Sequence, residues 1–430
     1  MFFQIFCMRV YHLLITVLLL ISAPAFSQQT LRGLVLEDDR YNKLPIDPDY
    51  GKELGLQGKV DNKARFPRVI NQSNENNAVA WSATYYGMSA LQSSVSDALS
   101  PAFTYRSVQQ KSLGCSEAIS LIDVLESLST QGAVPGRTMG FHCVDTLTKL
   151  LYDSAQRYLL SGYTRLFNTY DSKDRKVQAI KRAVHTKSPV VIGLLCPVSF
   201  QYAKEFWSPN EKPLREYGGH ALVVVGYDDA KFGGAFEVVN SWGKSWGKEG
   251  YSWIRYADVA NFVLYGFEML STTEKTDLEI TFTTAEGAKM DPLISKSGLY
   301  KFSQPYLTGQ SFFIELFTKT PIFLNVIGID VSGQSGQLFP ATKQSYLLAA
   351  SLRLPTGGGY YTLEGAPGTN GLLFIFSRTQ KALEQVIQSI SERGMEALPS
   401  QSKTATWEKN KVRFSDKAIL TFVTVEIIQR

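Results

Sequence analysis

The chain is poor in the residues that build metal, phosphate and nucleic-acid sites. Its 430 residues include four cysteines and four histidines, with neither a Cys-x-x-Cys pair nor another metal-ligand spacing. A glycine-rich phosphate loop is lacking too, so the sequence predicts no metal and no other cofactor. Lysine and arginine form no dense run, so the formal net charge of +5 gives little support to nucleic-acid binding.

Apolar residues form a run of membrane-like character only at the start of the chain. Arg9 precedes the apolar residues 13–21, and the small-residue segment Ala-Phe-Ser follows at 25–27. This order is typical of a secretory signal peptide, here residues 1–27. The run is short for an uncleaved membrane anchor, and no cysteine follows it as in a bacterial lipoprotein. We therefore expect a secreted, periplasmic or cell-surface protein without stable membrane insertion after cleavage.

The few cysteines limit what thiol chemistry can do here. Cys7 lies in the predicted signal peptide, which leaves Cys115, Cys143 and Cys196 in the exported chain. An exported protein can oxidise such thiols to a disulfide. Cys196 lies in the apolar run 190–197, and a thiol buried among apolar groups is inert, so we do not expect catalysis there.

Two neighbouring motifs are the most informative part of the chain. Residues 218–227 read Gly-Gly-His-Ala-Leu-Val-Val-Val-Gly-Tyr, and residues 238–247 read Val-Val-Asn-Ser-Trp-Gly-Lys-Ser-Trp-Gly. They place His220 on one apolar strand and Asn240 on the next, with tryptophans behind the Asn. A cysteine peptidase needs this arrangement, because the Asn carbonyl holds the general base in the right tautomer and the tryptophans exclude water. A lone histidine would be better explained as a core residue, but the two motifs together are specific.

On these motifs, followed in order by Gly250-Tyr251, the chain resembles the papain family of cysteine peptidases. The resemblance implies an α+β fold with a helical lobe, a β-barrel-like lobe and a cleft between them. It also implies a disulfide between Cys115 and Cys143, since the family bridges this loop to a later segment.

The resemblance breaks at the nucleophile. The segment Val-Ile-Asn-Gln ending at Gln72 matches the family's opening, and the family spacing then puts the nucleophile at position 78, which is Ala78. Alanine has no nucleophilic atom, so no thioester can form. Ser82 lies a helical turn further on and does not replace it. Gln72 remains, and the family would use its side-chain amide in the oxyanion hole.

Two explanations of Ala78 stay open: a natural pseudopeptidase, or a Cys that was changed to Ala in this sequence. A second departure favours the first. Residues 114–118 read Gly-Cys-Ser-Glu-Ala where the family has Cys-Asn-Gly-Gly. Side chains there replace the glycines that let substrate backbone approach closely.

Composition divides the chain into successive regions. We expect a signal peptide (1–27), an extended N-terminal arm (28–64), a papain-like domain (65–272), a linker (273–280) and a β-rich domain (281–430). In the papain-like region the apolar spacing predicts helices at 80–93, 116–131 and 175–185, and strands at 190–195, 221–227, 235–240 and 251–255. Beyond the linker it predicts strands at 312–316, 322–329, 346–354, 372–376 and 419–428, and one helix at 382–393. The last region therefore reads as a β-sandwich with one helix.

The tail also resembles, over short motifs, a module found at the C-terminus of bacterial caspase-like and other exported proteins. The matching pieces are residues 325–330, 336–340 and 374–378. No role for the module follows from the residues themselves.

Three functions remain as hypotheses. The leading one is an exported bacterial papain-family protein that cannot cleave and binds a peptide or protein partner through its cleft and tail. The second is a cysteine endopeptidase in which a thiolate at position 78 attacks, His220 transfers the proton, Asn240 orients it and Gln72 stabilises the oxyanion. The third makes the domain a scaffold for the β-rich tail.

Overall fold

The fold is described from a computed structural model of residues 33–430, with several short gaps. The residues outside the description within that range are 45, 48–49, 52–54, 93–96, 110–114, 271–276, 295–299, 319–321, 342–345, 349–350, 379, 395–404, 409–410 and 415–419. The predicted signal peptide, residues 1–27, also lies outside the described residues.

The helical lobe is built around a helix that is buried on all sides. It begins as α3 (Ala78–Ala80) and continues as the π-helix η2 (Trp81–Met88), whose residues are all buried. The helix begins two residues earlier than predicted, so Ala78 is its first residue. It contacts α4 (Pro101–Val108) and α5 (Leu121–Thr130) on one side and strands of the second lobe on the other. Because the helix is packed on all sides, its sequence is apolar all round and not on one face only.

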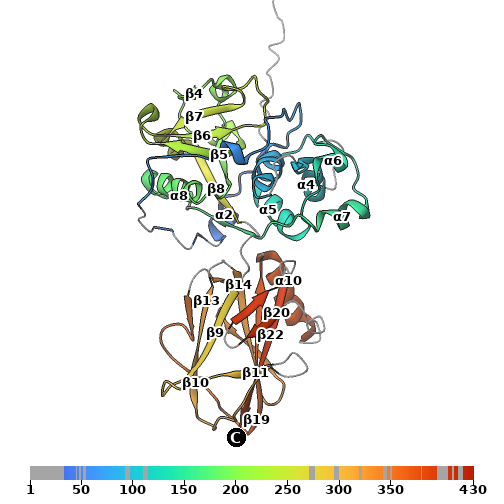
Figure 1. The fold of residues 1–430 in the computed structure, drawn as a ribbon, viewed down its shortest axis with the longest axis vertical. Helices are drawn as coiled ribbons and strands as arrows, with labels where there is room; N and C mark the ends of the chain where they lie inside the picture. Colours follow the sequence, from blue (N-terminus) through green and yellow to red (C-terminus); the bar gives the residue numbers. More distant parts are fainter. Residues whose placement is uncertain are drawn as a thin grey trace, which may run out of the picture. The chain divides into compact units, whose positions relative to one another are not determined.

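The other helices of this lobe are short. α5 begins at Leu121 rather than at the predicted residue 116, because the side chain of Ser120 accepts a hydrogen bond from Asp123 N and caps the helix there. Two further helices, α6 (Gly136–Met139) and α7 (Lys149–Ala155), complete the lobe, which is drawn in cyan and teal in Figure 1.

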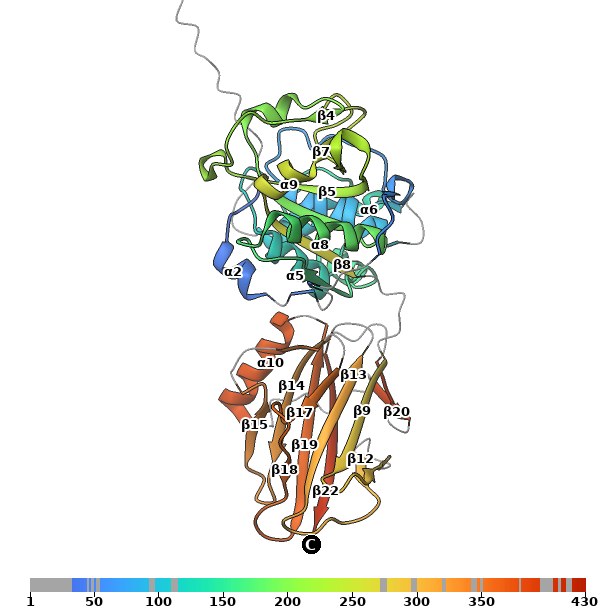
Figure 2. The same ribbon diagram turned by 90° about the vertical axis from the view of Figure 1, so that its left-hand side faces the viewer.

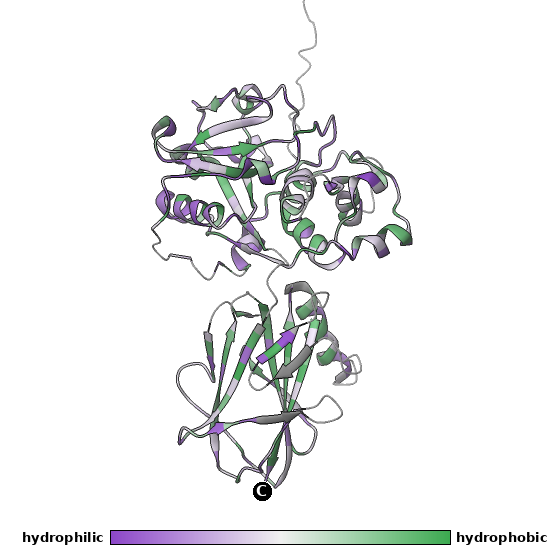
Figure 3. Ribbon diagram, viewed as in Figure 1, coloured by the Kyte–Doolittle hydropathy of each residue, from purple (hydrophilic) through white to green (hydrophobic). Residues whose placement is uncertain are grey.

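The second lobe is a mostly antiparallel sheet with the order β2-β8-β3-β5-β6-β7-β4. These strands are β2 (Gly162–Arg165), β3 (Val190–Leu195), β4 (Phe206–Trp207), β5 (Gly219–Asp228), β6 (Ala235–Val239), β7 (Tyr251–Arg255) and β8 (Val263–Leu270). The helices α8 (Lys173–His185) and α9 (Tyr256–Phe262) pack against it, and α8 turns a hydrophilic face outward (Figure 3). The predicted α+β two-lobe fold is confirmed.

The N-terminal arm is more structured than the extended segment that we predicted. It contains the helix α2 (Asp38–Lys43), the strand β1 (Lys59–Asp61) and the 3-10 turn η1 (Lys63–Arg65). β1 pairs antiparallel with the end of β5, so the arm adds a strand to the sheet. The sequence did not predict this strand, because only one residue of β1 is even partly buried and the strand therefore has no apolar pattern.

The C-terminal region consists of two facing sheets, as predicted (Figure 2). One has the order β17-β13-β9-β21-β20 with β10 and β18 beside it, and the other β11-β12-β22-β19-β14-β15 with β16 beside it. Their bounds are β9 (Asp277–Thr284), β10 (Lys289–Met290), β11 (Pro292–Ile294), β12 (Tyr300–Phe302), β13 (Ser311–Thr318), β14 (Ile322–Ile329), β15 (Ser335–Phe339), β16 (Tyr346–Leu348), β17 (Ser351–Leu354), β18 (Tyr361–Thr362), β19 (Gly368–Ser377), β20 (Ala405–Glu408), β21 (Lys411–Phe414) and β22 (Leu420–Gln429). Buried apolar side chains from both sheets share one core, and α10 (Gln380–Arg393) covers the other face of the second sheet.

Two predictions in this region were wrong. The predicted linker 273–280 overlaps β9, which begins at Asp277, and its residues 273–276 lie outside the described part of the chain. Leu278 and Ile280 are buried between polar neighbours, so this strand has one apolar face only. The predicted strand 346–354 is two strands, since β16 pairs with β14 and β17 pairs with β13 in the opposite sheet.

Candidate active site

His220 and Asn240 form the hydrogen-bonded pair that the sequence predicts. His220 Nε2 lies 2.9 Å from Asn240 Oδ1, and both side chains are buried. The same oxygen accepts a hydrogen bond from the backbone N–H of Ser241 at 2.8 Å. A backbone donor beside the oxygen fixes which way the amide points, so Nε2 must carry the hydrogen. The neutral ring then has its basic lone pair on Nδ1.

The sheet brings the two residues together. His220 is the second residue of β5. The strand β6 ends at Val239, one residue before its predicted end, so Asn240 directly follows the strand. Its backbone N–H donates to Gly250 O at 3.1 Å, and its carbonyl accepts from Tyr86 Oη at 3.0 Å. Gly250 has a φ of +89°, and a Cβ there would lie 2.5 Å from the side chain of Val69. The position therefore requires glycine.

Aromatic rings cover this pair. The Trp242 ring lies 4.5 Å from the His220 ring, centroid to centroid, and Trp246 meets Trp242 edge-on at 6.1 Å. Phe200, which the sequence did not single out, contacts both tryptophans, and its carbonyl accepts from Trp246 Nε1 at 2.8 Å. These rings exclude water from the pair, which strengthens its hydrogen bond.

Ala78 occupies the nucleophile position at the start of the buried central helix. It is fully buried, and α3 contacts β5, the strand that carries His220. Its side chain is a methyl group, so no atom here can attack a carbonyl. Ser82 is buried one turn on, and its hydroxyl donates to Ala221 O at 2.8 Å. It is a structural link between helix and sheet, as expected.

Gln72 is tied to the residue that follows Asn240. Its backbone N–H donates to Ser241 O at 2.7 Å, and its Oε1 accepts from the Ser241 hydroxyl. Its Nε2 donates to Glu75 O at 2.6 Å. One of the two amide hydrogens is therefore used within its own loop, and an oxyanion would require the other. The role of Ser241 was not foreseen, although it lies inside the Asn motif.

The loop before Ala78 is fastened to the disulfide. Cys115 and Cys143 are bonded, as the resemblance implied, with a Cα–Cα distance of 5.8 Å. Glu75 Oε1 accepts from Cys143 N at 2.8 Å, and its Oε2 accepts from Asn77 Nδ2 at 2.6 Å. Glu75 thus joins the loop to the disulfide-bonded segment. No pattern in the sequence predicts this contact. Cys196 is buried and takes no part in a disulfide.

The chain's own arm lies against this site. The backbone N–H of Leu34 donates to Gly219 O at 3.2 Å, next to His220. Ile119 N–H donates to Gly33 O, and Val35 N–H donates to Ile119 O, both at 3.1 Å. A short stretch of arm therefore pairs with the strand of the β lobe and with the helical lobe at once. A Cβ on Gly33 would lie only 3.0 Å from Ala78 N, so the arm passes directly beside the nucleophile position.

The helix α2 holds the arm to both lobes by charge. Arg40 donates to Asp123 of α5 at 2.6 Å, and Asp38 pairs with Arg215 and accepts from Tyr265 Oη at 2.7 Å. Burial works to raise the pKa of Asp38, but the hydrogen bonds from Arg215 and Tyr265 outweigh it and lower the pKa. Asp38 is therefore ionised at neutral pH.

Metal-binding clusters and membrane-spanning helices are two further features to consider in the described part of the chain. Among the described residues, no three His, Cys, Asp or Glu side chains gather closely enough to hold a metal ion. Within the same part of the chain, no helix combines the length and the apolar character that crossing a membrane requires.

Comparison with known proteins points to one family. Residues 110–266 match the family described as papain family cysteine protease. Mouse cathepsin K is 36% identical over 76 residues, which cover 17% of this chain and 23% of that protein. An uncharacterised peptidase C1-like protein of Acanthamoeba polyphaga mimivirus is 33% identical over 115 residues, or 26% of this chain and 36% of that protein. The matches thus span about a quarter to a third of these relatives.

Solved structures resemble part of the chain at low sequence identity. Xylellain, a cysteine protease from Xylella fastidiosa, is 22% identical, with a TM-score of 0.44 over 56% of this chain and 96% of that one. Digestive procathepsin L 3 of Tenebrio molitor is 16% identical, with a TM-score of 0.45 over 56% and 77%. The family match over residues 110–266, which contain His220 and Asn240, identifies a papain-family C1 peptidase domain in this chain.

Proposed function

We propose that this chain is an exported papain-family protein that binds a peptide or protein partner and does not hydrolyse it. The observation that carries the proposal is Ala78, a methyl group at the start of the central helix, beside an intact His220–Asn240 pair. Covalent catalysis needs a thiolate at that position, and the other groups cannot supply one. Export rests on the predicted signal peptide.

Peptide binding is supported by what the domain does with its own arm. The backbone of residues 33–35 is held by Ile119 on one side and by Gly219 on the other. Main-chain pairing of this kind gives affinity, and the buried side chain of Leu34 adds selectivity for the sequence. We propose that a partner peptide takes over these hydrogen bonds when the arm leaves.

A synthetic peptide tests this binding mode. A labelled peptide with the sequence of residues 28–37 is titrated against a chain that begins at residue 38, and binding is followed by fluorescence anisotropy. We expect saturable binding, and weaker binding of a peptide with Leu34→Asp, because Leu34 is buried at the site. Equal binding of a scrambled peptide, or no binding at all, would contradict the proposal.

A second candidate is a cysteine endopeptidase that lacks only its thiol. The hydrogen bond from His220 Nε2 to Asn240 favours it, because it puts the basic lone pair on Nδ1 as an acting general base requires. A thiolate at position 78 would attack the peptide carbonyl, His220 would return the proton to the leaving amine, and Gln72 would stabilise the oxyanion with its remaining amide hydrogen.

Ala78→Cys separates the two candidates. The chain with and without this change, each starting at residue 28 or at residue 38, is treated with an epoxide peptide probe and with a fluorogenic peptide. Labelling of residue 78 with peptide cleavage would support the endopeptidase. A reactive-thiol control reagent that labels residue 78 while the epoxide probe and the substrate fail would support the binding protein.

A further inference from the structure

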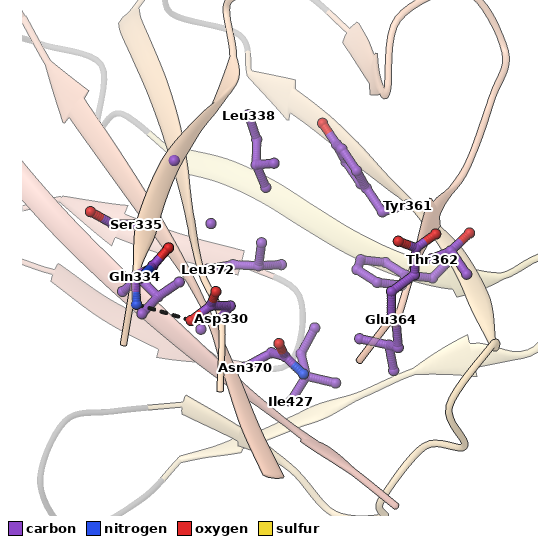
Figure 4. A pocket seen from close by; sticks show the side chains of 16 residues that line it. Asp330, Gln334, Ser335, Leu338, Tyr361, Thr362, Glu364, Asn370, Leu372 and Ile427 are labelled. Carbon is purple, nitrogen blue, oxygen red and sulfur yellow. Dashed lines mark hydrogen bonds between the residues drawn. The ribbon is translucent and has the colours of Figure 1, made fainter. Parts of the chain in front are cut away.

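The open end of the C-terminal sandwich contains a cavity of about 420 Å³ (Figure 4). It lies where β14 ends and β15 begins, and β18, β19 and the last residues of β22 complete it. This volume is within the usual range of ligand pockets, roughly 300–1,000 Å³.

The inner wall of the cavity is apolar. It includes the buried side chains of Phe312, Leu363 and Leu372, with Leu338 and Tyr361 partly exposed above them. Tyr361 is held by ring contact with Phe312, at a centroid distance of 5.9 Å. Such a surface accepts an aliphatic stem or a ring face, but it gives no direction to a polar ligand.

The mouth of the cavity is negatively charged. Of the described residues that line it, Asp330 and Glu364 are the ones with charged side chains, and no lysine, arginine or histidine is among them. Figure 4 shows these two carboxylates on opposite sides of the cavity. Both are exposed to solvent, so neither needs an internal partner.

The Asp330 carboxylate is held in place by hydrogen bonds to the chain. Asp330 Oδ1 accepts from Ser332 N at 2.9 Å, from the Ser332 hydroxyl at 2.6 Å and from Gln334 N at 2.9 Å. The hydrogen bond from the Ser332 hydroxyl is the main cause that lowers the pKa of Asp330, which is therefore ionised. Since these bonds all end on Oδ1, a ligand would meet Oδ2.

The Glu364 turn is fixed from inside the sandwich. Gln429, which is 2% exposed, donates through Nε2 to the carbonyls of Glu364 at 3.3 Å and Gly365 at 3.2 Å. Its Oε1 accepts from Asn370 Nδ2 at 2.7 Å, so the Oδ1 of Asn370 is left as an acceptor at the cavity. The buried amide of Gln429 thus fixes one side of the mouth. The groups on this side that face the cavity are hydrogen-bond acceptors.

We propose that this cavity binds a basic side chain, arginine or lysine, of a peptide segment. The aliphatic stem would lie on Leu372 and Phe312, and the cation would lie between Asp330 and Glu364. A mouth of acceptors with two negative charges repels anions and attracts a cation, and the apolar wall suits the three or four methylenes that precede it. The inference concerns the C-terminal region alone and does not depend on the proposed function of the papain-family domain.

The test compares two matched peptides on the full mature chain. Acetyl-Gly-Arg-Gly-amide and its citrulline counterpart have nearly the same shape, but citrulline is neutral. Saturation-transfer NMR and competition by the lysine and norleucine peptides give the relative affinities. We expect the arginine peptide to bind at least about fivefold more tightly than the citrulline peptide, as one or two partly exposed ion pairs provide.

Variants of the chain locate the site. Asp330→Asn keeps the Oδ1 acceptor of the turn but removes the charge, and Glu364→Gln removes the charge on the other side. Each should lower the affinity for the arginine peptide about twofold to fivefold. Glu315→Gln, on an exposed residue of β13 outside the cavity, should leave it unchanged. Equal binding of arginine and citrulline, unchanged affinity in both cavity variants, or preferential binding of a disaccharide would overturn the proposal.

Discussion

The two regions of the chain bury polar groups in opposite ways. The papain-family domain buries His220, Asn240, Ser241 and Gln72 in one hydrogen-bonded set between its lobes. The sandwich encloses an apolar core, and the two carboxylates of its cavity, Asp330 and Glu364, are exposed to solvent. A buried polar set must have fixed partners, and those partners leave motifs in the sequence. A cavity lined by ordinary core residues and two surface acids leaves none.

The largest expected effect comes from variants of the buried hydrogen-bonded set in a chain that also carries Ala78→Cys. Removal of the general base with His220→Ala should slow epoxide labelling of residue 78 by about 10²–10⁴-fold. Asn240→Ala should slow the labelling less, because the His220 ring keeps its basic nitrogen and loses only the Asn240 oxygen that orients it. The measurement is the second-order labelling rate by mass spectrometry. Equal rates in all forms would mean that the buried set does not act on position 78.

The next effect tests the apolar core of the sandwich. Phe374 is fully buried at the meeting of the two sheets, so Phe374→Ala should lower the free energy of unfolding of that region by about 4 kcal/mol. Urea unfolding followed by circular dichroism measures it. The exposed Phe317 serves as the matched control, since Phe317→Ala removes the same group from the surface of β13 and should cost far less.

A smaller effect tests one hydrogen bond of the buried set. Tyr86→Phe removes the donor to Asn240 O and leaves that carbonyl without this partner in the interior. We expect a loss of about 1–2 kcal/mol in the free energy of unfolding, with little change in packing. Tyr360→Phe, on an exposed ring of the sandwich, is the comparison. A loss of equal size there would contradict the contrast between buried and exposed polar groups.

The smallest effect concerns acid and the arm. The pKa of Asp38 is lowered in the fold, so its contribution to stability is complete above its unfolded-state value of about 3.9 and is lost as the pH falls through the folded value. The pair with Arg215 is partly exposed, and we expect well under about 1 kcal/mol. Thermal midpoints of the chain and of Asp38→Asn, measured between about pH 2.5 and 6, should converge at the acid end. A difference between the two thermal midpoints that widens toward low pH would contradict the predicted pH dependence.

Much of the papain-family domain could be predicted from the sequence, because its strands are fully buried apolar runs with clear ends. The strands 190–195 and 251–255 were predicted to the residue. Asn240 was placed on a strand but lies just beyond one, since a side chain that must turn toward His220 does not continue the ladder. The contacts of Glu75 and of the arm could not be predicted, because they join residues about 70 to 190 positions apart without a periodic pattern.

In the sandwich, most of the long strands were predictable, but β9 and the short strands were not. β14 and β19 carry continuous apolar residues, but strands of two or three residues, such as β10 and β18, are too short to show alternation. Asp330, Glu364 and Gln429 were not singled out. They lie in turns or at a strand end, and only the closure of the sandwich brings them to one mouth.

The contact between Trp242 and His220 makes the site optically readable. An indole whose ring lies against an imidazole loses fluorescence when that imidazole becomes positively charged, because the cation accepts an excited electron. The 4.5 Å ring separation puts the two within that range. Emission that depends on protonation of His220, and that disappears in Trp242→Phe, would report the charge state of the general base without any substrate, nucleophile or label.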